Sequence, residues 1–373
     1  MKVPKQQAFI CSNSILVELK GLLLAGGHGT RLRPLTYTGN KHMLPIANKP
    51  MLLYGLEQLV KAGIKDIAII LGPIKEGVVD TIGDGSNFGA NVTYIEQPEP
   101  KGLAHAVMIS EDFMDEDEFV MYLGDNLLKE GVDTFVRSFK SKGLDALVGV
   151  YPVKEPSRFG IVEKDDKGTL RFVEKPKQPK SNLALIGVYV FGSAIFDAVK
   201  NIKPSWRNEL EITDAIQYMV ERGKRVEVLN VNGWWKDTGK PEDLLEANQL
   251  ILSDLNGEMK GELSEETAYT GSLIMGERSK TIGRVNIRGP VIIGKDCTIG
   301  PNVYIGPYTS IGDECILKNT EIENSIVMRG CRIESGKRIV DSLIGNYSTV
   351  IDSNASIPQG HRLIIGERSF AQL

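Results

Sequence analysis

Short apolar runs alternate with amphipathic stretches from Lys20 to about Ser253. The apolar runs have the length of buried strands, and the amphipathic stretches repeat their apolar positions with helical spacing. This pattern predicts strands at 22–24, 67–71, 91–95, 119–123 and 146–150, and helices at 51–62, 104–110, 131–140 and 241–255. Strands and helices that alternate in this way predict an α/β fold with a mostly parallel sheet, whose ligands bind at the carboxyl ends of the strands.

A pattern with a period of six residues follows in the last third of the chain. An isoleucine followed by glycine recurs at 293, 299, 305 and 311, and a small residue stands two positions before each isoleucine. This repeat predicts a parallel β-helix in which three hexads form one triangular turn. We expect the large and small residues to point inward and the glycines to turn the corners with positive φ. The phase slips after Leu317, and we expect the coils to continue with insertions to about Ile365.

The change of pattern predicts the domain boundaries. We expect an N-terminal extension at 1–19, an α/β domain at 20–255, a polar connector at 256–275, the β-helix at 276–366 and a tail at 367–373. The sequence leaves open whether residues 1–19 form an extra strand, a loose extension or the product of an upstream start codon.

Composition narrows the function classes. The 373 residues are 42% hydrophobic and 25% charged, which is typical of a globular protein with two or three domains. The net charge of −4 argues against a broad nucleic-acid surface and favours small-molecule partners. No apolar run reaches the length of a membrane helix, and residues 1–19 are too polar for a signal peptide. We therefore expect a cytoplasmic protein that binds neither nucleic acid nor membranes.

The chain has four cysteines, at 11, 297, 315 and 331, and none shows CxxC spacing. This number is low for a disulfide framework and fits a reducing compartment. Cys297 and Cys315 are eighteen residues apart, so we expect them to stack in adjacent coils about 4.8 Å apart. Because free cysteine behaves as a small buried hydrophobe, packing is favoured over a metal or redox role.

The segment from Leu22 to Pro34 joins an apolar strand to a glycine-rich bend with two arginines. Glycines lack the Cβ atoms that would keep backbone amides away from phosphate oxygens. Arg31 adds a planar fork of donors, and Lys41 adds a compact second positive charge. The spacing matches neither a P-loop nor the complete dinucleotide fingerprint, so a tight turn without a ligand is the alternative.

Two aspartates are candidate metal ligands. Asp125 directly follows an apolar strand, and Asp237 lies in a segment with two tryptophans. Carboxylates at such positions can hold Mg²⁺ and share it with substrate phosphates. Each aspartate could instead belong to a turn, and the sequence does not show whether the two converge.

Two further segments carry candidate binding groups. The amide of Gln97 offers a donor and an acceptor that match one edge of thymine or uracil, although a glutamine in a solvent-facing loop is the alternative. Glu174 and Lys175 pair a carboxylate suited to sugar hydroxyls with an ammonium suited to phosphate. Adjacent opposite charges are also common on ordinary surfaces.

Taken together, these segments resemble the sugar-phosphate nucleotidylyltransferases over nearly the whole chain from Lys20. The resemblance is strongest to the long glucose-1-phosphate thymidylyltransferases, which carry a C-terminal β-helix. The matching motifs occur in the order of that family at 24–34, 41–46, 48–51, 97–104, 123–126, 159–163, 174–176, 209–214 and 237–239. The resemblance implies a Rossmann-like nucleotidyltransferase domain with a mixed, mostly parallel sheet, followed by a left-handed parallel β-helix.

The resemblance also implies roles for individual residues. The implied nucleotide site comprises Leu24, Gly26, Gly27, Gly29, Thr30, Arg31, Gln97, Pro100, Gly102 and Asp125. The implied sugar-phosphate site comprises Gly160, Glu174, Lys175 and Tyr189. Arg31, Lys41 and Lys175 would be catalytic, and Asp125 and Asp237 would hold Mg²⁺. The sequence departs from the shorter enzymes at His42, Lys101 and His105, which bears on nucleotide preference.

The implied reaction is the Mg²⁺-dependent transfer of a nucleoside monophosphate from dTTP to glucose 1-phosphate. It gives dTDP-glucose and pyrophosphate for deoxysugar or cell-surface polysaccharide biosynthesis. One alternative is a UTP-dependent pyrophosphorylase that makes UDP-glucose or UDP-N-acetylglucosamine, with or without acetyltransferase activity in the β-helix. Another is a non-catalytic regulatory subunit of the same architecture. We expect a homo-oligomer.

Overall fold

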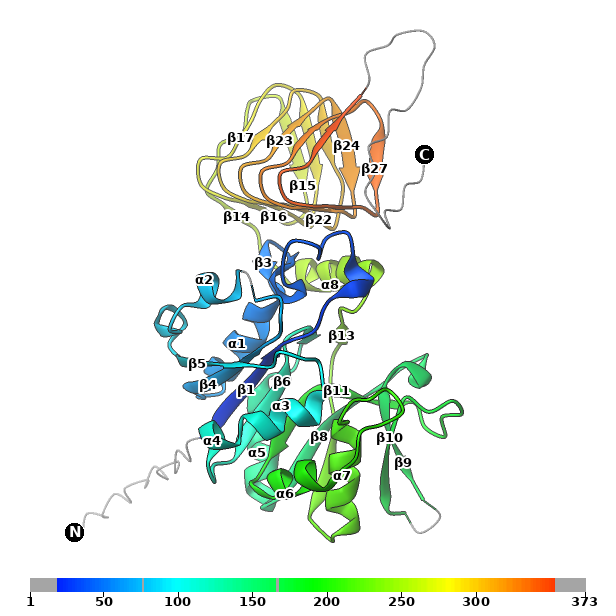
Figure 1. Cartoon of the computed structure of the whole chain (residues 1–373). Helices are drawn as coiled ribbons and strands as arrows, with labels where there is room; N and C mark the ends of the chain where they lie inside the picture. The colour runs from blue at the N-terminus through cyan, green and yellow to red at the C-terminus, as the bar shows by residue number, and fades with distance from the viewer. Residues whose placement is uncertain (1–18, 76, 166–167, 353–373) are drawn as a thin grey trace, which may run out of the picture.

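The computed structural model describes residues 19–75, 77–165 and 168–352 and shows two domains stacked end to end (Figure 1). The N-terminal domain is built on a nine-stranded sheet with the order β10-β9-β11-β6-β1-β4-β5, in which β8 joins β11 to β12. Its strands are β1 (Lys20–Ala25), β4 (Asp66–Leu71), β5 (Asn91–Glu96), β6 (Phe119–Leu123), β8 (Ala146–Pro152), β9 (Gly160–Lys164), β10 (Leu170–Glu174), β11 (Leu183–Phe191) and β12 (Val226–Asn230).

The sheet is mixed. Strands β5, β4, β1 and β6 run parallel, whereas β11 is antiparallel to β6, β8 and β9. Every strand expected from the apolar runs is present, with ends that differ by two residues at most. The α/β fold class is therefore confirmed, and β11 explains why one half of the sheet is not parallel.

Helices cover both faces of this sheet. Helices α1 and α5 pack on one face through Leu52, Leu56 and Phe135. Helices α3, α6 and α7 pack on the other through Val107, Phe196 and Ile216. The helices are α1 (Met51–Lys61), α2 (Val78–Ile82), α3 (Leu103–Ile109), α4 (Glu111–Met114), α5 (Val132–Lys142), α6 (Ala194–Asn201), α7 (Ile212–Glu221) and α8 (Pro241–Ser253).

Short strands and 3-10 turns complete the domain. Two small antiparallel pairs are formed by β2 (Pro45–Ile46) with β3 (Lys49–Pro50) and by β7 (Asn126–Leu128) with β13 (Trp235–Asp237). The 3-10 turns are η1 (Thr30–Leu32), η2 (Lys41–Met43), η3 (Ser86–Phe88) and η4 (Pro156–Arg158). No helix in the part of the chain that the structure describes combines the length and apolar composition needed to cross a bilayer.

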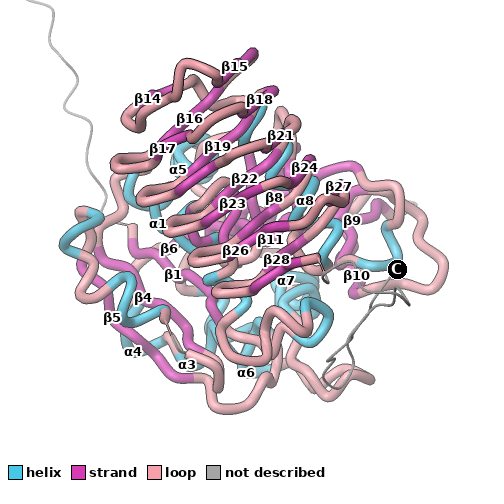
Figure 2. The backbone as a smooth tube through the Cα atoms, turned by 90° about the horizontal axis from the view of Figure 1, so that it is seen from above, coloured by secondary structure: helices cyan, strands magenta, loops and turns pink. Residues whose placement is uncertain are grey.

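The C-terminal domain is a coil of short strands in three parallel sheets, as expected for a left-handed parallel β-helix (Figure 2). The first sheet contains β14 (Glu258–Met259), β16 (Leu273–Met275), β19 (Val291–Ile293), β22 (Thr309–Ile311), β25 (Ile326–Val327) and β28 (Leu343–Ile344). The second contains β15 (Thr267–Thr270), β18 (Val285–Arg288), β21 (Val303–Ile305), β24 (Thr320–Glu323) and β27 (Arg338–Val340). The third contains β17 (Lys280–Thr281), β20 (Thr298–Ile299), β23 (Ile316–Lys318), β26 (Arg332–Glu334) and β29 (Thr349–Ile351).

The coil differs from expectation at both ends. Strands β14, β15 and β16 lie in the segment expected to be a connector. They pair in parallel with the strands of the next coil, so the β-helix already begins in this segment. The later coils lose residues rather than gain them: Val291 pairs with Thr309, 18 residues on, but Ile316 pairs with Arg332, only 16 residues on. The expected extension before Leu19, its Cys11, and the expected coils and tail after residue 352 lie outside the described residues.

The positive φ expected for the repeat glycines is found at Gly300 (φ 114°) but is wrong for Gly294, Gly306 and Gly312. The left-handed corner residue is usually the one two positions after the glycine, for example Asp296 (φ 58°) and Glu314 (φ 61°). Gly294 and Gly312 are required for a different reason, since a Cβ would lie 2.3 Å from the Asp313 Oδ1 atom at Gly294 and 2.7 Å from the Arg329 nitrogen at Gly312. These glycines allow neighbouring coils to approach each other.

The predicted cysteine stack is confirmed and includes a third member. The Thr298 amide donates to the Cys315 carbonyl, and the Ile316 amide donates to the Cys331 carbonyl, each at 2.9 Å. All three thiols are buried and free, and they donate to the carbonyls of Gly312, Met328 and Gly345 in the next coil. This environment is that of a core residue, as expected from packing.

Helix α8 joins the two domains (Figure 1). Leu244 and Ala247 of α8 share one buried cluster with Ile326 and Met328 of the β-helix. At its centre the fully buried Asn248 accepts from the Ala47 amide and the Ser310 hydroxyl and donates to the Tyr308 carbonyl. The β-helix is therefore docked by apolar contact and by a satisfied polar group.

We expect Asn248→Ala to lower the free energy of unfolding by about 2 kcal/mol or more, because it leaves several buried polar groups without partners. Gln249→Ala is the matched control, since it removes one half-buried bond to Asn324 and should cost about 1 kcal/mol or less. Thermal unfolding of the three proteins tests this expectation. Equal losses in both variants would contradict it.

Candidate active site

The glycine-rich loop lies at the carboxyl end of β1. Gly27 (φ 101°) and Gly29 (φ 58°) have left-handed conformations that favour glycine. The Thr36 hydroxyl donates to the Gly29 carbonyl at 2.8 Å, and the adjacent turn η1 is anchored by the buried Leu32. This anchoring leaves Arg31 exposed beside the loop, where it lines a cavity.

Asp125 is held beside this loop by the end of β6. The Gly124 amide donates to the Leu24 carbonyl at 2.9 Å, and a Cβ at Gly124 would lie 2.7 Å from that oxygen. Only glycine allows this approach. The Asp125 carboxylate forms an ion pair with Lys41, and both side chains are 15% exposed.

Neighbouring charges control the protonation of Asp125. Burial alone would raise its pKa, but the Lys41 charge, His42 and hydrogen bonds from Lys41 and Asn126 hold the pKa well below its usual range. Burial, and then the Lys41 charge, lowers the pKa of His42 to about 3. The site therefore holds an ionised aspartate beside a neutral histidine.

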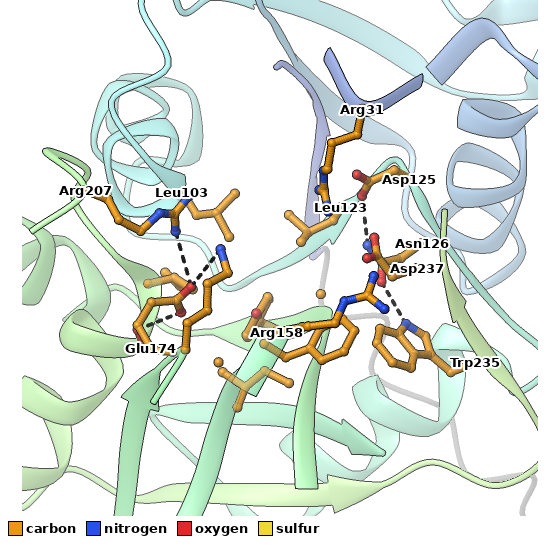
Figure 3. Close-up of a pocket in the computed structure, with 18 residues that line it drawn as sticks. Arg31, Leu103, Leu123, Asp125, Asn126, Arg158, Glu174, Arg207, Trp235 and Asp237 are labelled. Atoms are coloured by element: carbon orange, nitrogen blue, oxygen red, sulfur yellow. Dashed lines mark hydrogen bonds and ion pairs between the residues drawn. The ribbon is translucent and has the colours of Figure 1, made fainter. Parts of the chain in front are cut away.

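Asp237 converges with Asp125, which the sequence did not show. Strand β13 pairs with β7 so that Asp237 lies opposite Asn126, and the Thr238 amide and hydroxyl both donate to the Asp125 carbonyl, at 3.1 and 2.7 Å. Figure 3 shows the two aspartates on the same side of the cavity. Within the described ranges, no cation lies within ion-pair distance of Asp237.

Burial, and then the negative charge of Asp125, raises the pKa of Asp237 to about 6. Only one of the described lysines pairs with these two carboxylates, so a divalent cation bound between them would reduce the repulsion between Asp125 and Asp237. The described residues contain no group of three or more candidate side-chain ligands. Mg²⁺ commonly takes one or two protein carboxylates and completes its shell with water and phosphate oxygens, so Asp125 and Asp237 are the side chains that could hold it.

A cavity of about 240 Å³ opens on the glycine loop and is called the smaller cavity below. Seven of the residues expected at the nucleotide site line it: Leu24, Gly26, Gly27, Gln97, Pro100, Gly102 and Asp125. Lys41 also lines it, whereas Gly29 and Thr30 line neither this cavity nor its neighbour. These two residues form the turn that carries Arg31.

A larger cavity of about 460 Å³ adjoins the smaller one, since both are lined by Asp125, Leu103 and Leu123 (Figure 3). All four residues of the expected sugar-phosphate site line it, together with Arg31 and Asp237. Asp125 thus lies where the two cavities meet.

A charged cluster occupies the far wall of the larger cavity. Glu174 lies 3.3 Å from the Lys175 ammonium and 3.4 Å from the Arg207 guanidinium, and it accepts from the Thr213 hydroxyl. Burial raises the pKa of Glu174, and the Lys175 charge opposes this shift. Lys175 has a strained φ of 40°, a feature that is common at functional sites.

Two arginines that line this cavity, Arg158 and Arg207, were not predicted from the sequence. Arg158 ends η4, and Arg207 lies in the loop before α7 and pairs with Glu209 at 2.9 Å. No spacing or neighbouring apolar run marks them, because their positions come from the packing of loops against the sheet. Arg158 adjoins the 159–163 motif and Arg207 lies two residues before the 209–214 motif, but nothing in either motif indicates that the arginine reaches the cavity.

Comparison with known proteins agrees with this geometry. The nucleotidyl transferase family model matches residues 20–254, and the model of the GMPPB C-terminal domain matches residues 281–368. The chain belongs to the nucleotidyl transferase family. Both cavities and both aspartates lie within the first matched region.

Two curated relatives are similar over almost their whole length. The low-salt glycan biosynthesis nucleotidyltransferase Agl11 of Haloferax volcanii is 47% identical over 95% of this chain and 100% of its own length. A glucose-1-phosphate thymidylyltransferase of Streptomyces griseus is 44% identical over 95% of this chain and 99% of its own. Each alignment covers 95% of this chain and therefore extends over both of its domains.

Solved structures match the N-terminal domain. A Bacillus anthracis structure with bound sucrose is 38% identical, has a TM-score of 0.60 and covers 65% of this chain and 98% of that one. A UDP-glucose pyrophosphorylase in complex with UDP-glucose is 28% identical, with a TM-score of 0.57, and covers 64% of this chain and 100% of that one.

The raised pKa of Asp237 predicts a pH-dependent stability difference. In the folded protein the pKa of this group is about 6, above the ordinary aspartate pKa of 3.8, so its ionisation destabilises the fold as pH rises from about 4 through 6. We expect Asp237→Asn to melt at a higher temperature than the wild type at pH 8 without divalent cations, and the difference to vanish near pH 4. The exposed Asp80→Asn serves as control, and the same pH trend in both variants would contradict this account.

Proposed function

We propose that this chain catalyses the Mg²⁺-dependent transfer of a thymidylyl group from dTTP to glucose 1-phosphate, with release of pyrophosphate. The observation that carries the proposal is the pair of adjoining cavities that meet at Asp125. The 44% identity to a thymidylyltransferase over 95% of the chain supports the choice of substrates. The similarity to Agl11 supports a role in glycan or other cell-surface polysaccharide biosynthesis.

The smaller cavity suits the nucleotide. Gln97 offers its amide to the base, and the glycine loop offers backbone groups to the triphosphate beside Lys41. The larger cavity suits glucose 1-phosphate, because Glu174 can accept from sugar hydroxyls while Lys175 and Arg207 attract the phosphate. This arrangement places the two reacting phosphates near Asp125.

The reaction is an in-line attack by a phosphate oxygen of the sugar phosphate on the α-phosphorus of the nucleotide. A phosphate monoester has a second pKa of about 6, so the nucleophile is already mostly deprotonated at neutral pH. No general base is required. The barrier comes from repulsion between two anions, and Arg31, Lys41 and Lys175 reduce it by neutralising charge and aligning the phosphates.

Asp125 and Asp237 are the residues that would hold Mg²⁺. When bound there, the ion supplies positive charge to the phosphate oxygens and offsets the repulsion between the two carboxylates. Lys41 pairs with Asp125 in the structure, and a bound triphosphate offers its ammonium a second anionic partner.

Other functions fit the observations less well. A non-catalytic regulatory subunit has no need for the cations and carboxylates that this chain keeps, namely Arg31, Lys41, Asp125, Lys175 and Asp237. A UTP-dependent pyrophosphorylase is the second candidate, because thymine and uracil differ by one methyl group, worth only about 1 to 3 kcal/mol in an apolar pocket. The expected homo-oligomer stays a prediction.

The substrate assignment is tested by pyrophosphate release with glucose 1-phosphate and each of dTTP, UTP, GTP, ATP and CTP. We expect the highest kcat/KM with dTTP and the next highest with UTP. A preference for UTP would establish the second candidate, and binding of sugar phosphate without pyrophosphate release from any nucleotide would favour the regulatory subunit.

We expect Lys41→Ala to reduce kcat by on the order of a hundredfold or more, because it removes a cation that acts on the transferred phosphate. Lys61→Ala, at the exposed end of α1, is the matched control and should keep wild-type turnover. Steady-state kinetics at saturating Mg²⁺ measures both variants. Normal turnover in Lys41→Ala would remove this residue from the mechanism.

A further inference from the structure

The side chain of Gln97 is fixed at the wall of the smaller cavity. Its backbone amide donates to the Leu71 carbonyl at 2.8 Å, just after β5, and the residue is only 7% exposed. Its Oε1 atom faces the glycine loop, 3.6 Å from where a Cβ of Gly26 would lie. Both residues line the smaller cavity.

The amino group of the Gln97 amide has two acceptors. Nε2 lies 3.2 Å from the Gly102 carbonyl and 2.9 Å from the Nδ1 atom of His105. An amide nitrogen carries two hydrogens, so both are used. Because the Gly102 carbonyl can only accept, the amino group belongs on this side, and His105 takes the tautomer with its proton on Nε2.

The Oε1 atom remains available to a ligand. It has no hydrogen-bond partner among the described residues, and it is not one of their buried unpartnered polar atoms. This oxygen is therefore not completely buried, although the residue as a whole is only 7% exposed. Gln97 presents an acceptor, not a donor, to whatever occupies the smaller cavity.

The position of His105 is fixed by the start of α3. Gly102 has φ 101°, and a Cβ there would lie 2.3 Å from the Leu210 carbonyl, so the backbone is tightly packed. The Ala104 amide donates to the same carbonyl at 3.0 Å. Burial of the ring, and then the charge of Lys101, lowers the pKa of His105, which keeps the Nδ1 lone pair available.

We propose that His105 is a positioning residue that orients the Gln97 amide so that the site selects nucleobases with an imino N–H, thymine and uracil, over cytosine. Cytosine has an acceptor at the corresponding ring nitrogen, and an acceptor opposite Oε1 cannot form a hydrogen bond. His105 acts through Gln97 and does not itself contact the base. This inference rests on the proposed function, since it assumes that the base enters the smaller cavity.

The test compares kcat/KM for dTTP and dCTP, with glucose 1-phosphate and Mg²⁺, in the wild type and three variants. His105→Leu and His105→Phe remove the acceptor with two different apolar shapes, and His105→Asn returns an acceptor near the place of Nδ1. We expect the dTTP preference to fall roughly tenfold in both apolar variants, mainly through KM for dTTP, because one buried N–H loses its partner. We expect His105→Asn to keep most of the wild-type preference for dTTP over dCTP.

An unchanged preference in the apolar variants that fold would overturn the proposal, as would a loss in His105→Asn as large as in His105→Leu. Melting temperatures without nucleotide identify the variants that fold. A wild type that releases no pyrophosphate would overturn the proposed function instead. In that case the proposal is tested by the rise in melting temperature that dTTP or dCTP produces in the presence of Mg²⁺. A larger rise with dTTP in the wild type, lost in His105→Leu or His105→Phe, supports the proposal. Equal rises with the two nucleotides in the wild type overturn it.

Discussion

Repulsion between two carboxylates is the constraint on which the active site depends. Asp125 and Asp237 converge from strands that are far apart in the sequence, and among the described cations only Lys41 pairs with either of them. Burial, and then the negative charge of Asp125, raises the pKa of Asp237, and the pair is left short of positive charge. A site of this kind favours a bound cation, and four further cationic side chains line the adjoining cavity: Arg31, Arg158, Lys175 and Arg207.

The β-helix contributes to the same site from outside the cavities. Leu32 directly follows Arg31 and Leu44 lies three residues after Lys41, and both leucines belong to the buried cluster that contains Met328 of the β-helix. Asn48, a few residues beyond Lys41, donates to the Ile311 carbonyl at 2.6 Å. Docking of the β-helix through α8 therefore stabilises the backbone of the elements that carry Arg31 and Lys41 as well as the joint between the domains.

Much of this organisation could be predicted from the sequence, because periodicity and strand ends are local signals. The apolar runs located the strands, and Asp125 follows β6 at the expected edge of the sheet. The cysteine stack followed from the six-residue repeat. Convergence of Asp237 with Asp125 could not be predicted, because it depends on the pairing of β13 with β7.

The errors have physical reasons too. Backbone conformation is not visible in a repeat, so the corner role was assigned to glycines that instead allow close contact between coils. A loss of phase does not show whether residues were added or removed, and the registers show shorter coils. Arg158 and Arg207 carry no local signal, since tertiary packing alone brings them to the cavity.

The most direct test of the central claim is a crystal structure of the chain with Mg²⁺, a non-hydrolysable dTTP analogue and glucose 1-phosphate. We expect the base beside Gln97, the cation between Asp125 and Asp237, and a sugar-phosphate oxygen in line with the α-phosphorus at about 3 to 3.5 Å. A cation bound away from both aspartates, or a nucleotide base in the larger cavity, would contradict the account.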